Sequence, residues 1–161
     1  QLMRDFGVLP SAQNAFLLDL GLQTLPVRMP QHCKNAQIVA EYLEKHEKVE
    51  FVNYPGLPSN NQHEKALKYL PNGCSGVISF SIKGPRENAA RFMDALQIAS
   101  VVTHVADIRT LALQPANTTH RQLTDEQLKA GGITPGLVRF SVGLENIDDI
   151  LADVAQALEK V

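Results

Sequence analysis

An arginine in the middle of an alternating strand is the residue of this sequence best suited to bind an anion. Residues 137–142 read Leu-Val-Arg-Phe-Ser-Val, and alternation places Val138, Phe140 and Val142 on the core face. Arg139 therefore points to the opposite face. Its guanidinium presents a rigid fork of donors that matches a carboxylate or phosphate held by two hydrogen bonds. A surface arginine or a structural ion pair is the alternative, and the strand pattern leaves both interpretations open.

Polar side chains gather in the segments that precede this strand. They are His104, Asp107, Arg109, Thr118, Thr119, His120 and Arg121. Loops held by a rigid sheet often carry ligand-binding groups. The Thr-Thr-His run supplies hydroxyls and an imidazole, which suit hydrogen bonding or general acid–base chemistry. Surface or structural roles are equally consistent with two histidines in a loop.

Motifs for several other kinds of chemistry are missing from the sequence. The histidines and cysteines fit no metal-ligand spacing, so no metal site is predicted. There is no glycine-rich phosphate-binding fingerprint and no Gly-x-Ser-x-Gly nucleophile turn. None of the eight lysines lies in a setting that would lower its pKa for Schiff-base chemistry. The residues by themselves therefore predict a globular domain with an anion site at Arg139.

Size and charge exclude some broad classes of function. The 161 residues, 44% of them hydrophobic, can form one domain with a substantial core. Fifteen basic and seventeen acidic side chains give a net charge of −2, which argues against binding nucleic acid. No apolar run approaches the roughly 18 residues of a membrane span, so no membrane partner is expected. Two cysteines, Cys33 and Cys74, form no disulfide framework, and we expect a cytoplasmic protein with free thiols.

Helices and short strands must position these groups. Ser11 is expected to cap a helix from residue 12 that Gly21 or Pro26 ends, and Pro30 to begin a second helix. The remaining elements follow in chain order: a strand over 48–54 with Val49 and Phe51 on one face, a helix over 62–70, a strand over 76–82, a helix after 84–85, strands over 98–103 and 110–113, the strand over 137–142, and a helix capped by Asn146. Interleaved helices and half-polar strands predict an α/β or α+β domain with one open sheet face.

Several collinear segments together resemble one enzyme family. They are residues 10–18, 21–29, 52–57, 62–63, 76–80, 115–120 and 136–145. These segments span nearly the whole chain and resemble the C-terminal domain of the pyridoxal-phosphate enzymes of cysteine and methionine metabolism. That family includes O-acetylhomoserine sulfhydrylase, cystathionine γ-synthase and methionine γ-lyase. The resemblance implies a small, mostly antiparallel sheet covered by helices on one face, as in fold-type I aminotransferase-like enzymes.

The resemblance also implies roles for three residues. Arg139 corresponds to the arginine that binds the α-carboxylate of the substrate, and Thr119 to a residue lining the pocket. His104 stands where the family has a serine or asparagine that helps to hold this carboxylate. The sequence departs from the family here, because an imidazole replaces a small side chain and Ala106 replaces a glycine. No catalytic, cofactor-binding or metal-binding residue is assigned within this chain.

The family's Schiff-base lysine and phosphate-binding groups belong to a preceding domain. We therefore expect residues 1–161 to be the C-terminal small domain of a longer enzyme, with 1–46 as its leading helical segment, and the abrupt start at Gln1 agrees with this. The cofactor domain would be absent and the isolated chain inactive.

Residues 118–123 are most similar to the O-acetylhomoserine sulfhydrylases of the family. This likeness implies pyridoxal phosphate as the cofactor and O-acetylhomoserine as the amino-acid substrate. Sulfide or a thiol would replace acetate to give homocysteine or methionine, in a homo-oligomer, as a homotetramer. The alternatives are a domain of methionine γ-lyase or cystathionine γ-synthase, and a non-catalytic binding or assembly module.

Overall fold

The computed structural model describes residues 5–161 and contains a five-stranded sheet. Its strands are β1 (Val49–Asn53), β2 (Val77–Ile82), β3 (Ser100–Val101), β4 (Leu111–Leu113) and β5 (Leu137–Ser141), in the spatial order β1-β2-β5-β4-β3. The pairs β1–β2, β2–β5 and β4–β5 are antiparallel, and only β3–β4 is parallel. The predicted mostly antiparallel sheet is therefore confirmed.

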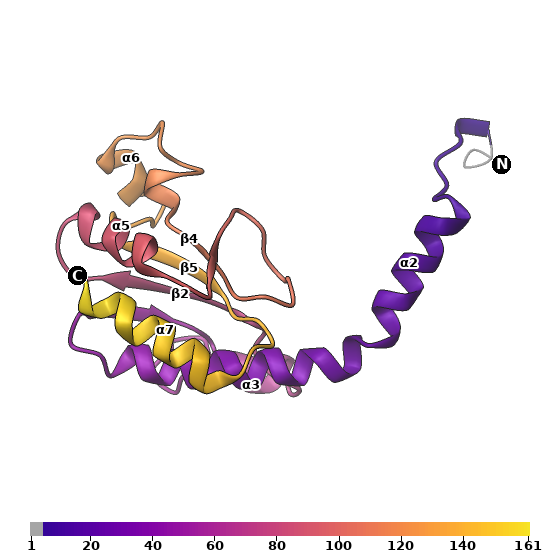
Figure 1. The fold of residues 1–161 in the computed structure, drawn as a ribbon, viewed down its shortest axis with the longest axis horizontal. Helices are drawn as coiled ribbons and strands as arrows, with labels where there is room; N and C mark the ends of the chain where they lie inside the picture. The colour runs from indigo at the N-terminus through magenta and orange to yellow at the C-terminus, as the bar shows by residue number, and fades with distance from the viewer. Residues whose placement is uncertain (1–4) are drawn as a thin grey trace.

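Helices α3 (Leu25–Glu44), α5 (Arg86–Ala95) and α7 (Ile147–Glu159) cover one face of this sheet. The remaining helical elements are α2 (Ala12–Gln23), α4 (His63–Tyr69), the 3-10 turn η1 (Pro115–Asn117) and α6 (Asp125–Ala130). Helices α3 and α7 lie side by side along the sheet (Figure 1), and α5 packs against both α7 and β2. Within residues 5–161, no helix is both long and apolar enough to cross a membrane.

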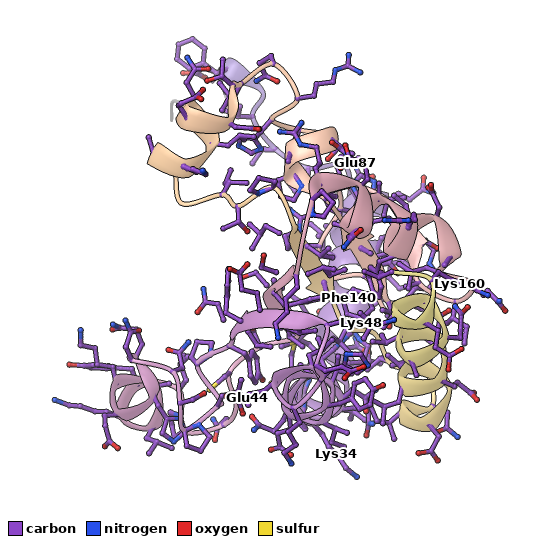
Figure 2. The ribbon with its side chains drawn as sticks, turned by 90° about the vertical axis from the view of Figure 1, so that its left-hand side faces the viewer. Lys34, Glu44, Lys48, Glu87, Phe140 and Lys160 are labelled. Carbon is purple, nitrogen blue, oxygen red and sulfur yellow. The ribbon has the colours of Figure 1, made fainter. Side chains whose placement is uncertain are left out.

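The core lies between the sheet and the helices α3, α5 and α7. Strand alternation puts Phe80 and Phe140 into it, and both side chains are fully buried. Phe80 meets Phe140 and Phe92 of α5 edge to face, with ring centroids 6.2 and 5.7 Å apart. Figure 2 shows Phe140 in the interior of the molecule. This packing fixes which face of β5 is left for Arg139.

Helix α2 projects away from the rest of the molecule (Figure 1), and none of its residues is buried. Ser11 caps it as predicted, because the Ser11 hydroxyl accepts a hydrogen bond from the N–H of Asn14 at 3.1 Å. The helix continues through Gly21 and ends at Gln23, so of the two predicted ends Gly21 is wrong and the end lies just before Pro26. Helix α3 then begins at Leu25 with Pro26 in its first turn, and Pro30 lies inside it. The predicted start of this helix at Pro30 is therefore wrong. Pro26 occupies the first turn instead, where a proline fits because its φ is already helical.

Strand β1 differs from its predicted alternation. Val49 is buried as expected, but Phe51 is 39% exposed. A bulge shifts the pairing register between these two residues. An extra residue in one strand reverses the alternation of side chains beyond it, so the prediction that Val49 and Phe51 share a face is wrong.

Candidate functional site

Arg139 lies on the open face of β5, between neighbours that point into the core. Val138 and Phe140 are fully buried on the helix-covered face. The Nη2 atom of Arg139 donates hydrogen bonds to the backbone carbonyls of Thr103 and His104, at 2.7 and 3.1 Å. Its Nε atom is buried and has no hydrogen-bond partner among the described residues. One end of the guanidinium is thus anchored while a charged N–H group still lacks an acceptor.

The segment from Thr103 to Arg109 folds over the strand next to Arg139. Ala106 adopts the left-handed backbone conformation, with φ of 63°, which a residue with a Cβ rarely adopts. Its N–H donates to the hydroxyl of Ser141 at 3.1 Å. Because Ser141 is two residues from Arg139 on the same face of β5, this bond places the segment beside the guanidinium.

An ion pair stabilises the turn that follows Ala106. The Nη2 atom of Arg109 lies 3.1 Å from the Asp107 carboxylate, which also accepts the Arg109 backbone N–H at 3.0 Å. The side-chain hydrogen bond from Arg109, followed by the backbone one, lowers the pKa of Asp107 to about 2. Asp107 is therefore ionised at neutral pH, and its carboxylate pairs with the Arg109 guanidinium within the turn.

Glu145 ties the far end of this segment to the end of β5. Its carboxylate accepts the backbone N–H of Thr110 at 2.6 Å and the Thr110 hydroxyl at 2.8 Å. The same hydroxyl accepts the N–H of Gly143 at 2.9 Å. A Cβ on Gly143 would come within 2.5 Å of the Arg109 carbonyl carbon, so only glycine permits this approach.

A small cavity of about 140 Å³ adjoins the segment at Ala106 and Ser141. The buried His32 of α3 lines its other side, and the His32 Nδ1 atom lies 2.8 Å from the carbonyl oxygen of Val142. A carbonyl oxygen can only accept, so this nitrogen carries the proton and donates. Asn35 of α3 likewise donates to the carbonyl of Gly143 at 3.0 Å. Helix α3 therefore holds the end of the strand that carries Arg139.

Two of the three predicted site residues are brought together. The structure joins Arg139 to His104, but through the His104 backbone carbonyl, and the His104 side chain is exposed. Thr119 is exposed in the turn after η1, and its hydroxyl lies 2.9 Å from Nδ1 of His120. Within residues 5–161, no hydrogen bond joins Thr119 to Arg139 or His104. The predicted substrate contacts of these side chains stay predictions.

Sequence reasoning missed three residues that shape this site: Thr110, Ser141 and Glu145. Ser141 could have been found, because strand alternation already placed it on the same face as Arg139. Thr110 and Glu145 are 35 positions apart in the chain. No local pattern indicates a bond over that separation.

The lysines of this chain do not fit a Schiff-base site. Lys48 donates to the backbone carbonyls of Leu158 and Val161, at 2.9 and 3.1 Å, and points toward the end of α7 (Figure 2). The other seven lysines are exposed. A lysine that forms an imine is desolvated or lies beside another cation, and no lysine here has that setting. Among residues 5–161, no group of three or more His, Cys, Asp or Glu side chains could hold a metal ion.

Comparison with known proteins finds one family model and several relatives that match nearly the whole chain. The family model described as "Cys/Met metabolism PLP-dependent enzyme" matches residues 1–159. An O-acetyl-L-homoserine sulfhydrylase of Leptospira meyeri is 47% identical over 99% of this chain and 36% of its own length. A homocysteine synthase of Schizosaccharomyces pombe is 49% identical over 99% of this chain and 37% of its own length. An L-methionine gamma-lyase of Fusobacterium nucleatum subsp. polymorphum is 43% identical over 96% of this chain and 39% of its own length.

A solved structure shows the same fold. A Campylobacter jejuni protein named as an O-acetylhomoserine (thiol)-lyase, with N'-pyridoxyl-lysine-5'-monophosphate, superposes with a TM-score of 0.89 at 43% identity. The match covers 99% of this chain and 38% of that one. The chain thus spans between 36% and 39% of the length of these four proteins.

Proposed function

Because this chain belongs to the Cys/Met metabolism PLP-dependent enzymes, we propose that Arg139 binds the α-carboxylate of an amino-acid substrate within a longer enzyme. The buried, unpartnered Nε of Arg139 carries this proposal. A buried donor without an acceptor costs about 1–3 kcal/mol, and more when the group is charged. A carboxylate supplies both the acceptor and the opposite charge, in charge-assisted hydrogen bonds.

The anchored geometry of Arg139 favours such a ligand. The carbonyls of Thr103 and His104 hold the Nη2 end, so the guanidinium does not have to be ordered when the substrate arrives. A preordered donor loses less side-chain entropy on binding. We place Thr119 and the His104 side chain beside the bound carboxylate; both are exposed and available for contact.

The longer enzyme, in this proposal, replaces the acetate group at the γ-carbon of O-acetylhomoserine by sulfide or a thiol and releases acetate, to give homocysteine or methionine. The names of the Leptospira and Schizosaccharomyces relatives support this reaction class. Pyridoxal phosphate, the cofactor of the family, supplies an electron sink when bound. Because no lysine of this chain fits its imine, residues outside 1–161 would hold it, and the isolated chain would be inactive. Assembly as a homotetramer in the cytoplasm is part of the same proposal and rests on the family alone.

Methionine γ-lyase activity is the second candidate, because relatives with that name are 42% to 45% identical to this chain. Turnover of the full-length protein with O-acetylhomoserine plus sulfide, compared with methionine alone, separates the two. Homocysteine from the first mixture without breakdown of methionine is the expected result. Rapid release of methanethiol from methionine, with no homocysteine formed, would overturn the assignment.

Arg139→Ala and Arg139→Lys in the full-length protein test the carboxylate site itself. Loss of a desolvated carboxylate contact costs on the order of 2–5 kcal/mol, so kcat/KM for O-acetylhomoserine should fall at least about 30-fold, mainly through KM. The lysine variant should remain impaired, because a single ammonium does not reproduce the fork of donors. The absorption spectrum of the cofactor should not change. Arg121→Ala, at an exposed position, is the matched control. An unchanged KM in both Arg139 variants removes this residue from the site.

A further inference from the structure

The two cysteines of the chain line the same cavity. Cys33 lies on α3 and Cys74 in the loop between α4 and β2, and both border a cavity of about 620 Å³. Both thiols are free and half-buried. Neither is used in the function proposed above, so their proximity has no role there.

Because residue 73 is a glycine, the Cys33 sulfur can pack closely against the backbone of the loop. A Cβ built on Gly73 would lie 2.7 Å from Cys33 Sγ, which is closer than real contacts allow. The residue also has φ of 124°, a conformation open essentially to glycine alone. Cys74 is the next residue in the chain, so the Cys33 sulfur packs against the residue that directly precedes Cys74. Burial first, and then the neighbouring Cys33, raise the pKa of the Cys74 thiol.

The loop is the part that can adjust to bring the sulfurs together. Residues 70–76 form no helix or strand, and Gly73 and Ser75 both have positive φ. One anchor of the loop is the Tyr54 hydroxyl, which donates to the Ser75 carbonyl at 3.0 Å. Cys33, in contrast, is held within a 20-residue helix. A disulfide requires Cα atoms about 4.4–6.8 Å apart, so Cys74 has to take up a position within that range of Cys33 for the bond to form.

We propose that Cys33 and Cys74 are an oxidation site that forms an intramolecular disulfide by exchange with a low-molecular-weight disulfide of the glutathione class. One cysteine thiolate attacks one sulfur of oxidised glutathione, forming a mixed disulfide and releasing one glutathione thiol. The thiolate of the other cysteine then attacks the protein sulfur of this mixed disulfide and releases the second glutathione. Two cysteine S–H bonds and one glutathione S–S bond are lost, and one protein S–S bond and two glutathione S–H bonds form. The two cysteines are oxidised and the glutathione disulfide is reduced.

Peptide mapping of the full-length protein tests this site. The native protein is reduced, freed of reductant, exposed to oxidised glutathione, alkylated and digested with trypsin. Cleavage after Arg28, Lys34, Lys68 and Lys83 places the two cysteines in separate peptides, residues 29–34 and 69–83. The expected product is one species that joins both peptides, with the mass of the pair less two hydrogens, and dithiothreitol separates it. Recovery of both cysteines alkylated, or each carrying its own glutathione, overturns the proposal.

Single variants test whether both thiols are needed. Cys74→Ser and Cys33→Ser should each accumulate glutathione on the remaining cysteine, because no second thiol is left to displace it. Glutathione retained on the wild type to the same extent as on the single variants contradicts the exchange. Far-UV circular dichroism before and after oxidation confirms that each variant is folded, so loss of the joined peptide reports on the thiol pair.

Discussion

The backbone N–H of Ala106 donates a 3.1 Å hydrogen bond to the hydroxyl of Ser141, two residues along β5 from Arg139. This bond and the Arg139 contacts to Thr103 and His104 hold the same loop segment on the same strand. The segment that borders the candidate carboxylate site is therefore held from two points of β5. The left-handed conformation of Ala106 accompanies this arrangement.

Ala106→Gly should stabilise the protein. A residue with a Cβ is strained at φ of 63°, and relief of this strain exceeds the greater entropy of glycine in the unfolded chain. We expect a gain of about 0.5–1 kcal/mol in the free energy of unfolding, measured by urea titration. Ala90→Gly, inside α5, is the matched control and should lose about 1 kcal/mol. A loss of stability in both variants would show that Ala106 is not strained.

Asp153→Asn should destabilise the connection between α5 and β3. The buried Asp153 carboxylate accepts the backbone N–H groups of Gln97, Ile98 and Ala99, at 2.8, 2.9 and 2.9 Å. An asparagine offers one acceptor oxygen and turns an NH₂ group toward these donors. The expected loss is at least about 2 kcal/mol, because each hydrogen bond to a charged group contributes roughly 1.5–3 kcal/mol. Asp94→Asn, at an exposed position on α5, should change the urea midpoint little. Equal midpoints for Asp153→Asn and the wild type would contradict this role.

Tyr54→Phe should lower stability at neutral pH and reduce its loss at alkaline pH. The Tyr54 ring is 1% exposed, and its hydroxyl donates to Ser75 at 3.0 Å. Removal of this bond should cost about 1 kcal/mol. Burial, and then Cys33 and Cys74, raise the pKa of Tyr54, so the folded protein holds the phenolic proton more tightly than the unfolded chain. The resulting stability is fully present below the ordinary tyrosine pKa of about 10 and is lost as the pH rises above it.

Urea midpoints between pH 8 and 11 measure this contribution of Tyr54. The wild type should lose stability above about pH 10, and Tyr54→Phe should lose less of it. Tyr69→Phe provides the control, because the Tyr69 ring is exposed. If the stability of the wild type and of Tyr54→Phe fell in parallel as the pH rose, Tyr54 would not be the cause of the alkaline loss of stability.

Phe140→Ala and Leu18→Ala should differ sharply in their effect on the free energy of unfolding of the 161-residue chain. Phe140 is fully buried against Phe80, and its truncation should cost about 3–5 kcal/mol. Leu18 on α2 is 65% exposed, and its truncation should change stability by less than about 0.5 kcal/mol. Urea unfolding followed by circular dichroism compares the two. A loss at Leu18 as large as that at Phe140 would show that α2 packs on another part of the protein.

Local patterns in the sequence determined the elements and the orientation of Arg139. Alternation over 137–142 is a property of neighbouring residues, because successive side chains of a strand point to opposite faces. The cap at Ser11 and the final helix after Asn146 follow from equally local rules, and both are observed. The paired strands 49–53 and 77–82 also lie where these rules predict, although no local rule indicated the bulge at Val49.

The tertiary structure alone decided what these residues meet. Arg139 donates hydrogen bonds to the carbonyls of Thr103 and His104, which precede it by 36 and 35 positions in the chain. Cys33 packs against Gly73. Such contacts depend on the path of an irregular loop and on left-handed conformations such as that of Ala106, which periodicity does not encode. The sequence therefore determined that a guanidinium would face away from the core. Only the fold decided that backbone carbonyls would hold one end of it and leave its buried Nε–H group without an acceptor.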